Sequence, residues 1–421
     1  MKFLTGGESP RAERQNRLNP GTDGIVRMKE TCIECFFVVC PEKSSRGFYM
    51  NEKHMNDEFY MKTALSLAAL GCGHVNPNPM VGAVIVKNGK IIGKGFHEKY
   101  GEAHAERKAL AACSSPPDGA VMYITLEPCC HYGKTPPCTD AIIESGIRKV
   151  VVGILDPNPL VSGKGVEILR QSGVEVVTGA LEKECAELNE VFFHYIKTNT
   201  PYVVMKYAMT MDGKIAAYTG KSRWITGEAA RNKVHMDRLR YSAVMVGVGT
   251  VVKDDPLLTC RIENGRNPVR VVCDTNLRTP LDSQIVSTAN DVPTIIATAS
   301  TDNEIRKKYI DKNCEIITVS KKGDHIGLNE LMDKLAEKKI DSILLEGGGA
   351  LNWSAINSGI VNKIQAYIAP KLLGGAGAFS PVGGLGVDSP DNAFFLANSK
   401  AAAIGEDILI ESDVVKKCLQ G

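Results

Sequence analysis

The residues best suited to chemistry are a histidine, a glutamate and two cysteines in the first half of the chain. His104-Ala105-Glu106 is followed by Cys129, directly after a proline, and then by Cys138. One imidazole and two thiolates can hold Zn²⁺ in three of its four tetrahedral positions and leave the fourth for water. A bound zinc lowers the pKa of that water to about 7, which makes hydroxide available at neutral pH. Glu106, which is not a ligand, can then move a proton between the water and a leaving group.

The order of these residues resembles the zinc deaminases, in which H-x-E precedes P-C and a second cysteine. The usual spacing is P-C-x-x-C, whereas eight residues, 130–137, separate Cys129 from Cys138 here. The run from Leu126 to Cys138 resembles the bacterial riboflavin-biosynthesis deaminases, which carry this longer insertion. Cys130 stands where that family usually has serine, and it is the alternative ligand. Cys129 fits the motif better because it follows Pro128.

Other segments of the first half share the resemblance to this family. They are residues 76–83, 100–104 and 156–159. The resemblance implies that Asn78 binds a pyrimidine and that His97 lies beside it. It also implies that His131, Lys134 and Thr135 contact the ribose phosphate of the substrate. A loop with a cation, a hydroxyl and a glycine amide suits a phosphate, and the alternative for Lys134 is a solvated surface lysine.

The second half carries a glycine run between a strand-like and a helix-like segment. Glu346 is followed by three glycines and then by the segment 351–358. Such a run lets backbone amides approach a phosphate at a helix N-terminus, although a flexible turn is the alternative. A Rossmann domain is not supported, because no G-x-G-x-x-G follows a first strand. Four segments resemble the reductase domain of the same bifunctional family: residues 206–216, 222–226, 247–259 and 345–348.

This second resemblance implies a fold similar to dihydrofolate reductase, with NADPH as the hydride donor. The residues implied at the cofactor are Ala208, Trp224, Thr250, Asp254, Gly348, Gly349, Ala350, Leu351, Asn352, Trp353 and Ser354. Those implied at the substrate are Ser222, Arg238, Leu258, Arg261 and Glu346. The two arginines suit a sugar phosphate, since guanidinium binds phosphate bidentately; a solvent-facing position is the alternative for Arg238. Asp212-Gly213 is interpreted as a structural turn rather than a catalytic acid.

The elements that must position these residues alternate between helices and short apolar strands. This pattern is typical of an α/β protein with a largely parallel sheet. A helix is expected from Asp57, as its N-cap, and Asn88-Gly89 predicts a hairpin between two strands. The first unit is expected to hold strands at 81–86, 91–92, 121–126, 149–154 and 174–177 and helices at 104–113, 137–145, 166–172 and 182–196. The second is expected to hold strands at 202–205, 242–248, 269–272, 294–297, 315–319, 342–345 and 363–369.

The polar run 197–201, which ends in a proline, marks a boundary between two domains. We therefore expect a cytidine-deaminase-like domain at 55–199 and a dihydrofolate-reductase-like domain at 200–421. Residues 1–27 are polar and rich in glycine and proline, which is typical of disorder. Our hypothesis is that Met55 is the natural start and that residues 1–54 are a translated leader.

Three cysteines of this leader, Cys32, Cys35 and Cys40, surround a short apolar run. A metal or redox site is one interpretation of their spacing. Incidental cysteines are the other, because no second Cys/His pair lies nearby to complete a tetrahedral site. The chain has 13 cysteines in all, and an odd number excludes a fully paired disulfide framework.

Composition limits the possible partners. The chain has 421 residues, 43% of them hydrophobic, as expected of a two-domain globular protein. Its net charge of +2 gives no indication of a basic stripe for nucleic acid. No stretch approaches the ~18 consecutive apolar residues of a membrane span. We expect a cytoplasmic homo-oligomer that binds zinc, NADPH and a small phosphorylated pyrimidine, without nucleic-acid or membrane partners.

The resemblance implies two reactions. The first is hydrolytic deamination of a diaminohydroxy-pyrimidine that carries a phosphoribosylamino group, and the second is reduction of its ribose to ribityl with NADPH. Three other functions share parts of the pattern: a nucleic-acid deaminase, a free-base or nucleoside deaminase joined to an unrelated NADPH domain, and an inactive zinc-stabilised binding module. The near-neutral charge disfavours the first. The open fourth zinc position disfavours the last.

Overall fold

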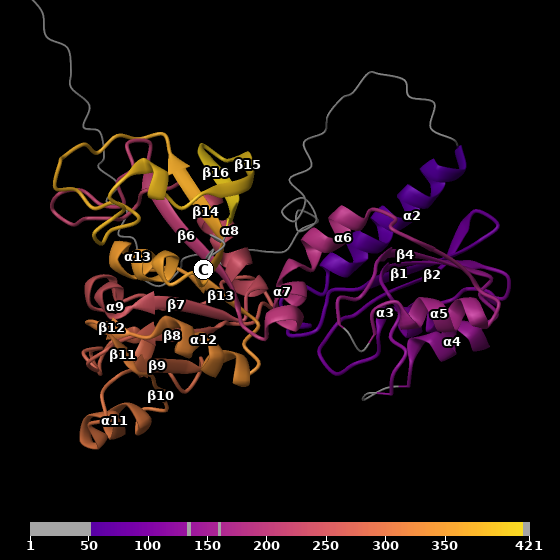
Figure 1. Cartoon of the computed structure of the whole chain (residues 1–421), viewed down its shortest axis with the longest axis horizontal. Coiled ribbons are helices and arrows are strands. Elements are labelled where there is room, and N and C mark those ends of the chain that lie inside the picture. The colour runs from indigo at the N-terminus through magenta and orange to yellow at the C-terminus, as the bar shows by residue number, and fades with distance from the viewer. Residues whose placement is uncertain (1–51, 133–135, 159–160, 416–421) are drawn as a thin grey trace, which may run out of the picture.

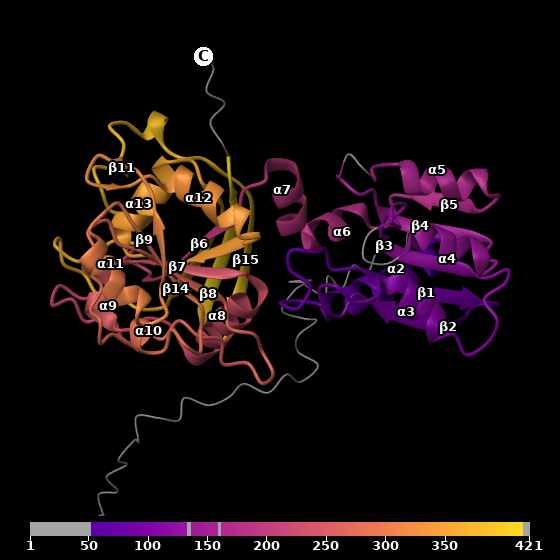
Figure 2. The same ribbon diagram turned by 90° about the horizontal axis from the view of Figure 1, so that it is seen from below.

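The computed structural model describes residues 52–132, 136–158 and 161–415, with side chains from residue 57 onward. Lys134, Thr135 and residues 1–51 of the predicted leader, with its three cysteines, lie outside the described residues. Two units are each built around one large β-sheet, and helix α7 (Glu190–Thr198) lies between them (Figures 1 and 2). The two predicted halves of the chain therefore correspond to two separate sheets.

The first unit is a five-stranded sheet covered by helices on both faces. Its elements are α2 (Glu52–Ala69), β1 (Gly82–Lys87), β2 (Lys90–Phe96), α3 (Ala105–Ala111), β3 (Val121–Leu126), α4 (Cys138–Glu144), β4 (Lys149–Ile154), α5 (Lys164–Gln171), β5 (Glu175–Thr178) and α6 (Glu182–Leu188). The strand order is β2-β1-β3-β4-β5, and only β3, β4 and β5 are parallel to one another. The expectation of a largely parallel sheet was thus wrong for β1, which pairs antiparallel with both neighbours.

The predicted hairpin explains this mixed sheet. Asn88 and Gly89 both have positive φ, of 51° and 75°, as a type I′ turn requires. Alternate side chains of β1 then face the two sides of the sheet: Ala83 and Ile85 pack with α3, α4 and α5, whereas Val84 and Val86 pack with α2 and α6. The central strands β1, β3 and β4 are therefore buried on both faces, whereas the edge strands β2 and β5 are partly exposed.

The second unit is a nine-stranded sheet in the order β10-β9-β8-β7-β13-β6-β14-β16-β15. Its strands are β6 (Tyr202–Thr210), β7 (Ala243–Gly247), β8 (Val269–Cys273), β9 (Thr294–Thr298), β10 (Glu315–Thr318), β13 (Ser342–Leu345), β14 (Val361–Ala369), β15 (Leu396–Ile404) and β16 (Asp407–Val414). Its helices are α8 (Glu228–Arg240), α9 (Val248–Asp254), α10 (Gln284–Ser287), α11 (Asn303–Ile310), α12 (Leu328–Glu337) and α13 (Gly349–Asn357). A short hairpin, β11 (Lys321–Lys322) and β12 (His325–Ile326), and the turn η1 (Pro390–Asn392) complete it.

Two helix predictions in the first unit were partly wrong, one at its start and the other in its middle. Helix α2 begins at Glu52, so Asp57 is not its N-cap. Asp57 instead accepts a hydrogen bond of 2.5 Å from the hydroxyl of Tyr123 on β3. The helix expected over 182–196 is broken at Asn189, whose side chain bonds the backbone N–H and C=O of Met80 at 2.8 and 2.9 Å. A side chain held in this way redirects the chain into α7.

Candidate active site

Three predicted metal ligands converge where β3 ends and where two helices begin. His104 is the N-cap of α3, Cys138 is the first residue of α4, and Cys129 lies in the loop after β3. Their ligand atoms all lie within 4.8 Å of one another. His104 Nδ1 is 3.5 Å from the Cys129 sulfur and 3.4 Å from the Cys138 sulfur. Cys130 is not part of this group among the described residues.

The chemistry of this donor set fits zinc. A hydrogen bond from Cys138 and the proximity of His104 lower the pKa of Cys129 to about 4, so a thiolate forms readily. The backbone N–H of Cys138 also donates to the Cys129 sulfur, at 3.4 Å. One imidazole and two thiols around one point match the three protein ligands of a catalytic zinc site.

Glu106 is the predicted proton carrier, and its surroundings suit that task. The residue lies on α3 two positions after His104 and is only 3% exposed. Burial, followed by the charge of Cys129, raises its pKa to about 7. A carboxyl group with a pKa near the working pH can both accept and donate a proton.

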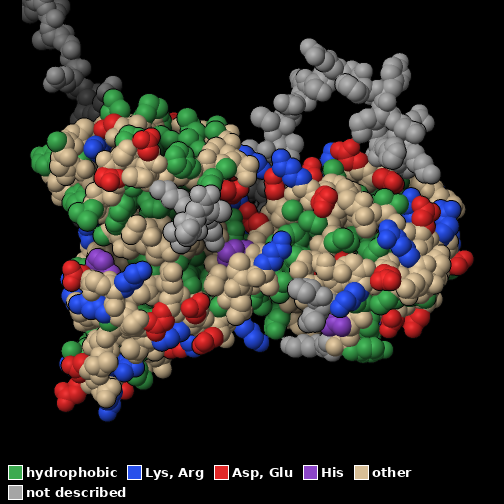
Figure 3. Space-filling model, in the orientation of Figure 1, with side chains coloured by type: hydrophobic (Ala, Val, Ile, Leu, Met, Phe, Trp, Pro, Cys, Tyr) green, Lys and Arg blue, Asp and Glu red, His purple; other side chains and the backbone are tan. Residues whose placement is uncertain are grey.

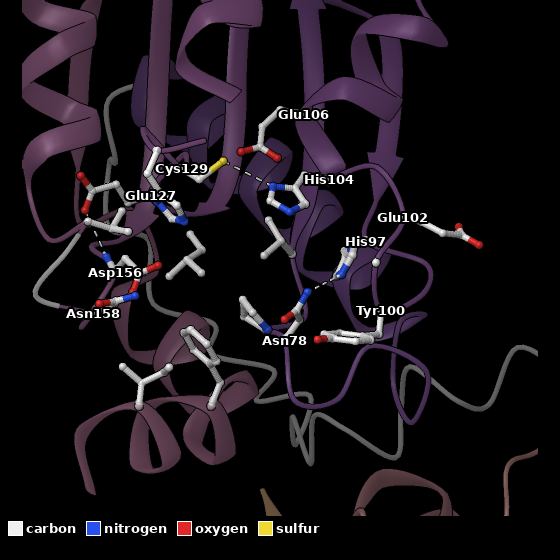
Figure 4. A pocket seen from close by; sticks show the side chains of 18 residues that line it. Asn78, His97, Tyr100, Glu102, His104, Glu106, Glu127, Cys129, Asp156 and Asn158 are labelled. Carbon is white, nitrogen blue, oxygen red and sulfur yellow. Dashed lines mark hydrogen bonds between the residues drawn. The ribbon is translucent and has the colours of Figure 1, made fainter. Parts of the chain in front are cut away.

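A cavity of about 360 Å³ opens in front of this group. Figure 4 shows Glu106, His104 and Cys129 at one end of it and Asn78 and His97 nearby. The Asn78 amide nitrogen lies 3.2 Å from Nε2 of His97. The predicted pair thus lies together at the cavity, and His131 lines it as well.

Further residues form the cavity wall. Tyr100, Asp156 and Asn158 belong to the segments 100–104 and 156–159 that share the resemblance, whereas no role was predicted for Glu127, Phe192 or Ile196. Glu127 is buried and positions the neighbouring loops, because its carboxylate accepts from the backbone N–H groups of Asp156, Gly163 and Val166 at 2.9–3.2 Å. Burial raises the pKa of Asp156 to about 6. Glu127 could have been noticed as an acidic residue at the end of a buried strand.

In the second unit, the glycine run forms the turn between β13 and α13. Gly348 is the N-cap of α13, and a Cβ there would lie 3.7 Å from the hydroxyl of Thr250, so two predicted cofactor residues are adjacent. Asn352 is buried on the first turn of α13, and its side-chain oxygen has no hydrogen-bond partner among the residues that the structure describes. Because backbone amides, a hydroxyl and a buried amide side chain meet here, the turn fits a phosphate-bearing cofactor.

The other residues predicted at the cofactor lie on several elements. Ala208 is on β6, Asp254 ends α9, and Trp224 is 60% exposed with the guanidinium of Arg231 at 4.7 Å from its ring centroid. The backbone carbonyl of Asp254 accepts from Arg223 at 2.9 Å. Ala350, Leu351, Trp353 and Ser354 continue α13.

The predicted substrate residues Arg238 and Glu346 bind each other. Arg238 donates from Nε and from a terminal nitrogen to the two Glu346 oxygens, at 2.7 and 3.0 Å, and also to the Thr259 carbonyl at 3.0 Å. Burial alone would raise the pKa of Glu346, but the charge of Arg238 lowers it to about 2. Arg238 is therefore held in place rather than facing solvent.

Further charged groups surround this pair. Partial burial lowers the pKa of Lys206, a half-buried lysine near Glu346 to which no role was assigned from the sequence. Burial and the charges of Arg238 and Arg261 lower the pKa of His235 to about 4. Arg261 thus lies near the pair. Leu258 is buried with a φ of 53°, and Ser222 lies in the loop before α8.

Together, the two sites define a class of protein: a metal-dependent deaminase joined to a reductase with a dihydrofolate-reductase-like fold. Residues 54–154 match the family model described as the cytidine and deoxycytidylate deaminase zinc-binding region. Residues 201–410 match the model described as the RibD C-terminal domain. The chain belongs to the RibD family of riboflavin biosynthesis proteins.

This chain aligns with its relatives over nearly the whole length of each relative. RibD of Actinobacillus pleuropneumoniae is 53% identical over 86% of this chain and 96% of its own, and RibD of Aquifex aeolicus is 45% identical over 84% and 97%. The structure is similar to that of Acinetobacter baumannii RibD, with a TM-score of 0.77 and 34% identity over 86% of this chain and all of that one. It is equally similar to the Thermotoga maritima diaminohydroxyphosphoribosylaminopyrimidine deaminase/5-amino-6-(5-phosphoribosylamino)uracil reductase, with a TM-score of 0.76 and 40% identity over 86% and 100%.

These comparisons confirm the predicted family, fold class and enzyme type. In addition, none of the helices in the described part of the chain has the length and apolar character needed to cross a membrane.

Proposed function

We propose that this chain catalyses two successive steps on one phosphorylated pyrimidine. The first removes an amino group hydrolytically from diaminohydroxyphosphoribosylaminopyrimidine, and the second uses NADPH to reduce the ribosyl group of the resulting aminouracil. The observation that carries the proposal is the convergence of His104, Cys129 and Cys138 beside buried Glu106 at a cavity of about 360 Å³. The Thermotoga maritima relative is named for both activities, which supports the same pair here.

In the deaminase step, zinc would be held by His104, Cys129 and Cys138 and would supply a Lewis acid that activates water. Glu106 would accept a proton from the attacking water and return it to the leaving amine, as its pKa of about 7 allows. Asn78 and His97 would hold the pyrimidine at the cavity. His131, with Lys134 and Thr135, would bind the ribose phosphate.

In the reductase step, the turn from Gly348 into α13 and the adjacent Thr250 would hold NADPH, whose nicotinamide supplies the hydride. Arg261 and the Arg238–Glu346 pair would orient the sugar phosphate of the substrate. Three of the five N–H groups of Arg238 donate to Glu346 and Thr259, and the other two suit a phosphate oxygen. The other predicted contacts, Ala208, Trp224, Asp254, Ser222 and Leu258, belong to the same proposal.

The finer predictions on organisation remain proposals. The deaminase domain would span residues 55–199 and the reductase domain 200–421, which agrees with the matched ranges of 54–154 and 201–410. NADPH as the nicotinamide cofactor, assembly into a homo-oligomer and a cytoplasmic location also stay predictions.

An absorbance assay with the phosphorylated diaminopyrimidine tests the proposal. We expect ammonia release without NADPH, and NADPH oxidation only after deamination. The matched comparison is the same compound without its 5′-phosphate, which should react poorly in both steps. Equal turnover of the dephosphorylated compound would instead favour a nucleoside deaminase joined to an unrelated reductase.

A further inference from the structure

Helix α7 lies between the two units and contacts both (Figures 1 and 2). On one side, the Tyr195 hydroxyl donates to the carbonyl of Ala336 in α12 at 3.1 Å. The His194 ring packs edge-on against Tyr202 of β6, with the ring centroids 5.5 Å apart. Val191 packs against the buried residues at the start of β6. This side of the helix rests on the reductase unit.

The other side of α7 faces the deaminase cavity. Phe192 and Ile196, four residues apart, both line the cavity in front of Glu106. Successive residues turn by about 100° around a helix, so these two side chains point largely away from Glu190 and His194. One short helix therefore carries an apolar part of the deaminase cavity wall on one side and contacts with the reductase unit on the other.

A charged cluster fixes α7 at its first residue. Glu190 accepts from Arg240 of α8 at 3.2 Å, from Lys363 of β14 at 2.5 Å and from the Tyr202 hydroxyl at 3.1 Å. The side chains of Glu190, Arg240 and Lys363 are only 19–20% exposed, so solvent screens their interaction less than that of a surface pair. All three partners belong to the reductase unit.

The Glu190 cluster lies far along the strands from the reductase site. Tyr202 begins β6 and Lys363 lies near the start of β14, whereas Glu346 directly follows the end of the parallel strand β13. Parallel strands place their carboxyl ends at one edge of the sheet and their amino ends at the other. The contacts of Glu190 with Tyr202 and Lys363 therefore lie away from the reductase site, whereas Arg240 lies only two residues after Arg238 on α8.

We infer that Glu190 is a positioning residue for the deaminase reaction: the reductase unit holds α7 through Glu190, and α7 in turn presents Phe192 and Ile196 to the pyrimidine. This inference rests on the proposed deaminase function. It means that the deaminase pocket is complete only when the second unit is docked against it. The substrate affinity of the first site then depends on residues that belong to the second.

Steady-state kinetics of Glu190→Ala in the full chain test the inference. We expect the KM of deamination to rise roughly five- to tenfold while its kcat changes less than about twofold, because substrate positioning is lost and the proton carrier is kept. Bound zinc and the KM for NADPH should stay as in the wild type. Glu190→Gln should bring the KM only partly back toward the wild-type value, because its single amide oxygen still accepts hydrogen bonds but carries no charge for Arg240 and Lys363.

The matched control is Glu187→Ala. Glu187 on α6 also pairs across the two units, with Lys400 at 2.9 Å, but both side chains are about half exposed (42% and 55%). This variant should behave like the wild type. A wild-type KM in Glu190→Ala, or an equal loss in both reactions, would overturn the inference.

If Glu190→Ala does not fold, Phe192→Leu carries the test, because it keeps the Glu190 carboxylate and changes the cavity wall directly. We expect it to raise the deamination KM with reductase kinetics unchanged. An unchanged deamination KM in Phe192→Leu would also overturn the inference. Absence of deamination by the wild-type chain would instead contradict the proposed function itself.

Discussion

At the scale of single residues, the deaminase site depends on placing an acid where its proton is easily exchanged. Glu106 is buried, and burial together with the nearby Cys129 thiolate keeps its pKa close to neutrality. The two predicted cysteine ligands come from different elements, because Cys129 lies in the loop after β3 and Cys138 begins α4, but both sulfurs lie close to the His104 imidazole. Each of these residues was identified from sequence, since the ligand types and their order are distinctive.

Cys129→Ala should weaken zinc binding by roughly 10²-fold or more, because one of three protein ligands is lost. Metal analysis of the purified protein after mild chelation measures the effect. Cys130→Ala is the control, and it should keep its zinc because Cys130 is outside the ligand group. Full zinc content in Cys129→Ala with loss in Cys130→Ala would reverse the assignment.

The Arg238–Glu346 pair gives the reductase unit a pH-dependent stability. The pKa of Glu346 falls from 4.5 to about 2 on folding, so the folded state binds the proton more weakly than the unfolded state. The contribution of the Glu346 carboxylate to the free energy of unfolding is fully present above pH ~4.5 and is lost as the pH falls through about 2. We expect the melting temperature to fall less between about pH 5 and 3 in Glu346→Gln than in the wild type, as measured by calorimetry.

Glu337→Gln is the control for that experiment, because Glu337 is exposed at the end of α12. Its melting temperature should follow the wild-type pH dependence. Identical pH profiles for Glu346→Gln and the wild type would show that the pair does not contribute in this way.

At the scale of elements, the glycine turn before α13 is the part of the second site whose shape depends most directly on its residues. Gly349 is enclosed: an added Cβ would come within 2.9 Å of the Ser380 carbonyl oxygen and 3.1 Å of the Gly383 nitrogen. The loop that carries Ser380 and Gly383 also bonds back to Gly349, with the Gly383 N–H donating to the Gly349 carbonyl at 2.9 Å. A side chain at Gly349 must therefore displace this loop from the turn.

Gly349→Ala should raise the dissociation constant for NADPH by roughly tenfold, because the shifted turn no longer presents its amides correctly. Fluorescence titration with NADPH measures this, while the deamination rate should not change. Gly377→Ala is the matched control, since a Cβ there meets nothing within 4 Å. Unaltered NADPH binding in Gly349→Ala would show that the turn is not part of the cofactor site.

Two features of the fold, strand β15 and the break between α6 and α7, were missed because neither has a local signal in the sequence. Strand β15 has the sequence LANSKAAAI and is mostly exposed, so it lacks the alternation that identifies a strand. It forms because β16 pairs with it at the edge of the sheet. The break between α6 and α7 was missed for a similar reason: the hydrogen bonds of Asn189 to Met80 span 109 residues. Buried strands such as β3 and β4, with continuous apolar runs, were predicted at their correct positions.

The lack of a local sequence signal also explains why part of the deaminase cavity wall was not predicted. The ligands and Glu106 lie in a recognisable motif, but Phe192 and Ile196 reach the cavity only because α7 is docked between the units. An apolar side chain on a helix carries no local signal of the cavity that it lines. Sequence alone therefore predicted the chemistry better than the shape of the pocket.

At the scale of the whole molecule, specific contacts join the two units. The Asn76 amide donates to the buried carboxylate of Asp341 at 2.8 Å, and Arg266 donates to the Gly73 carbonyl at 2.7 Å. Asp341 also accepts from the hydroxyl of Ser242. On the face shown in Figure 3, positive and negative side chains are interspersed, in keeping with the net charge of +2. The two units are thus joined without a continuous patch of one charge on that face.

The most direct test of the central claim uses Glu106→Gln in the assay that couples both reactions. We predict that this variant keeps its zinc but loses deamination by roughly 10²-fold or more, since the proton carrier is removed. NADPH oxidation should fall equally when the reaction starts from the diaminopyrimidine, and should be normal when the deaminated aminouracil is supplied. Glu144→Gln, which changes an exposed carboxylate at the end of α4, is the control and should behave like the wild type. Wild-type NADPH oxidation by Glu106→Gln from the diaminopyrimidine would contradict the account.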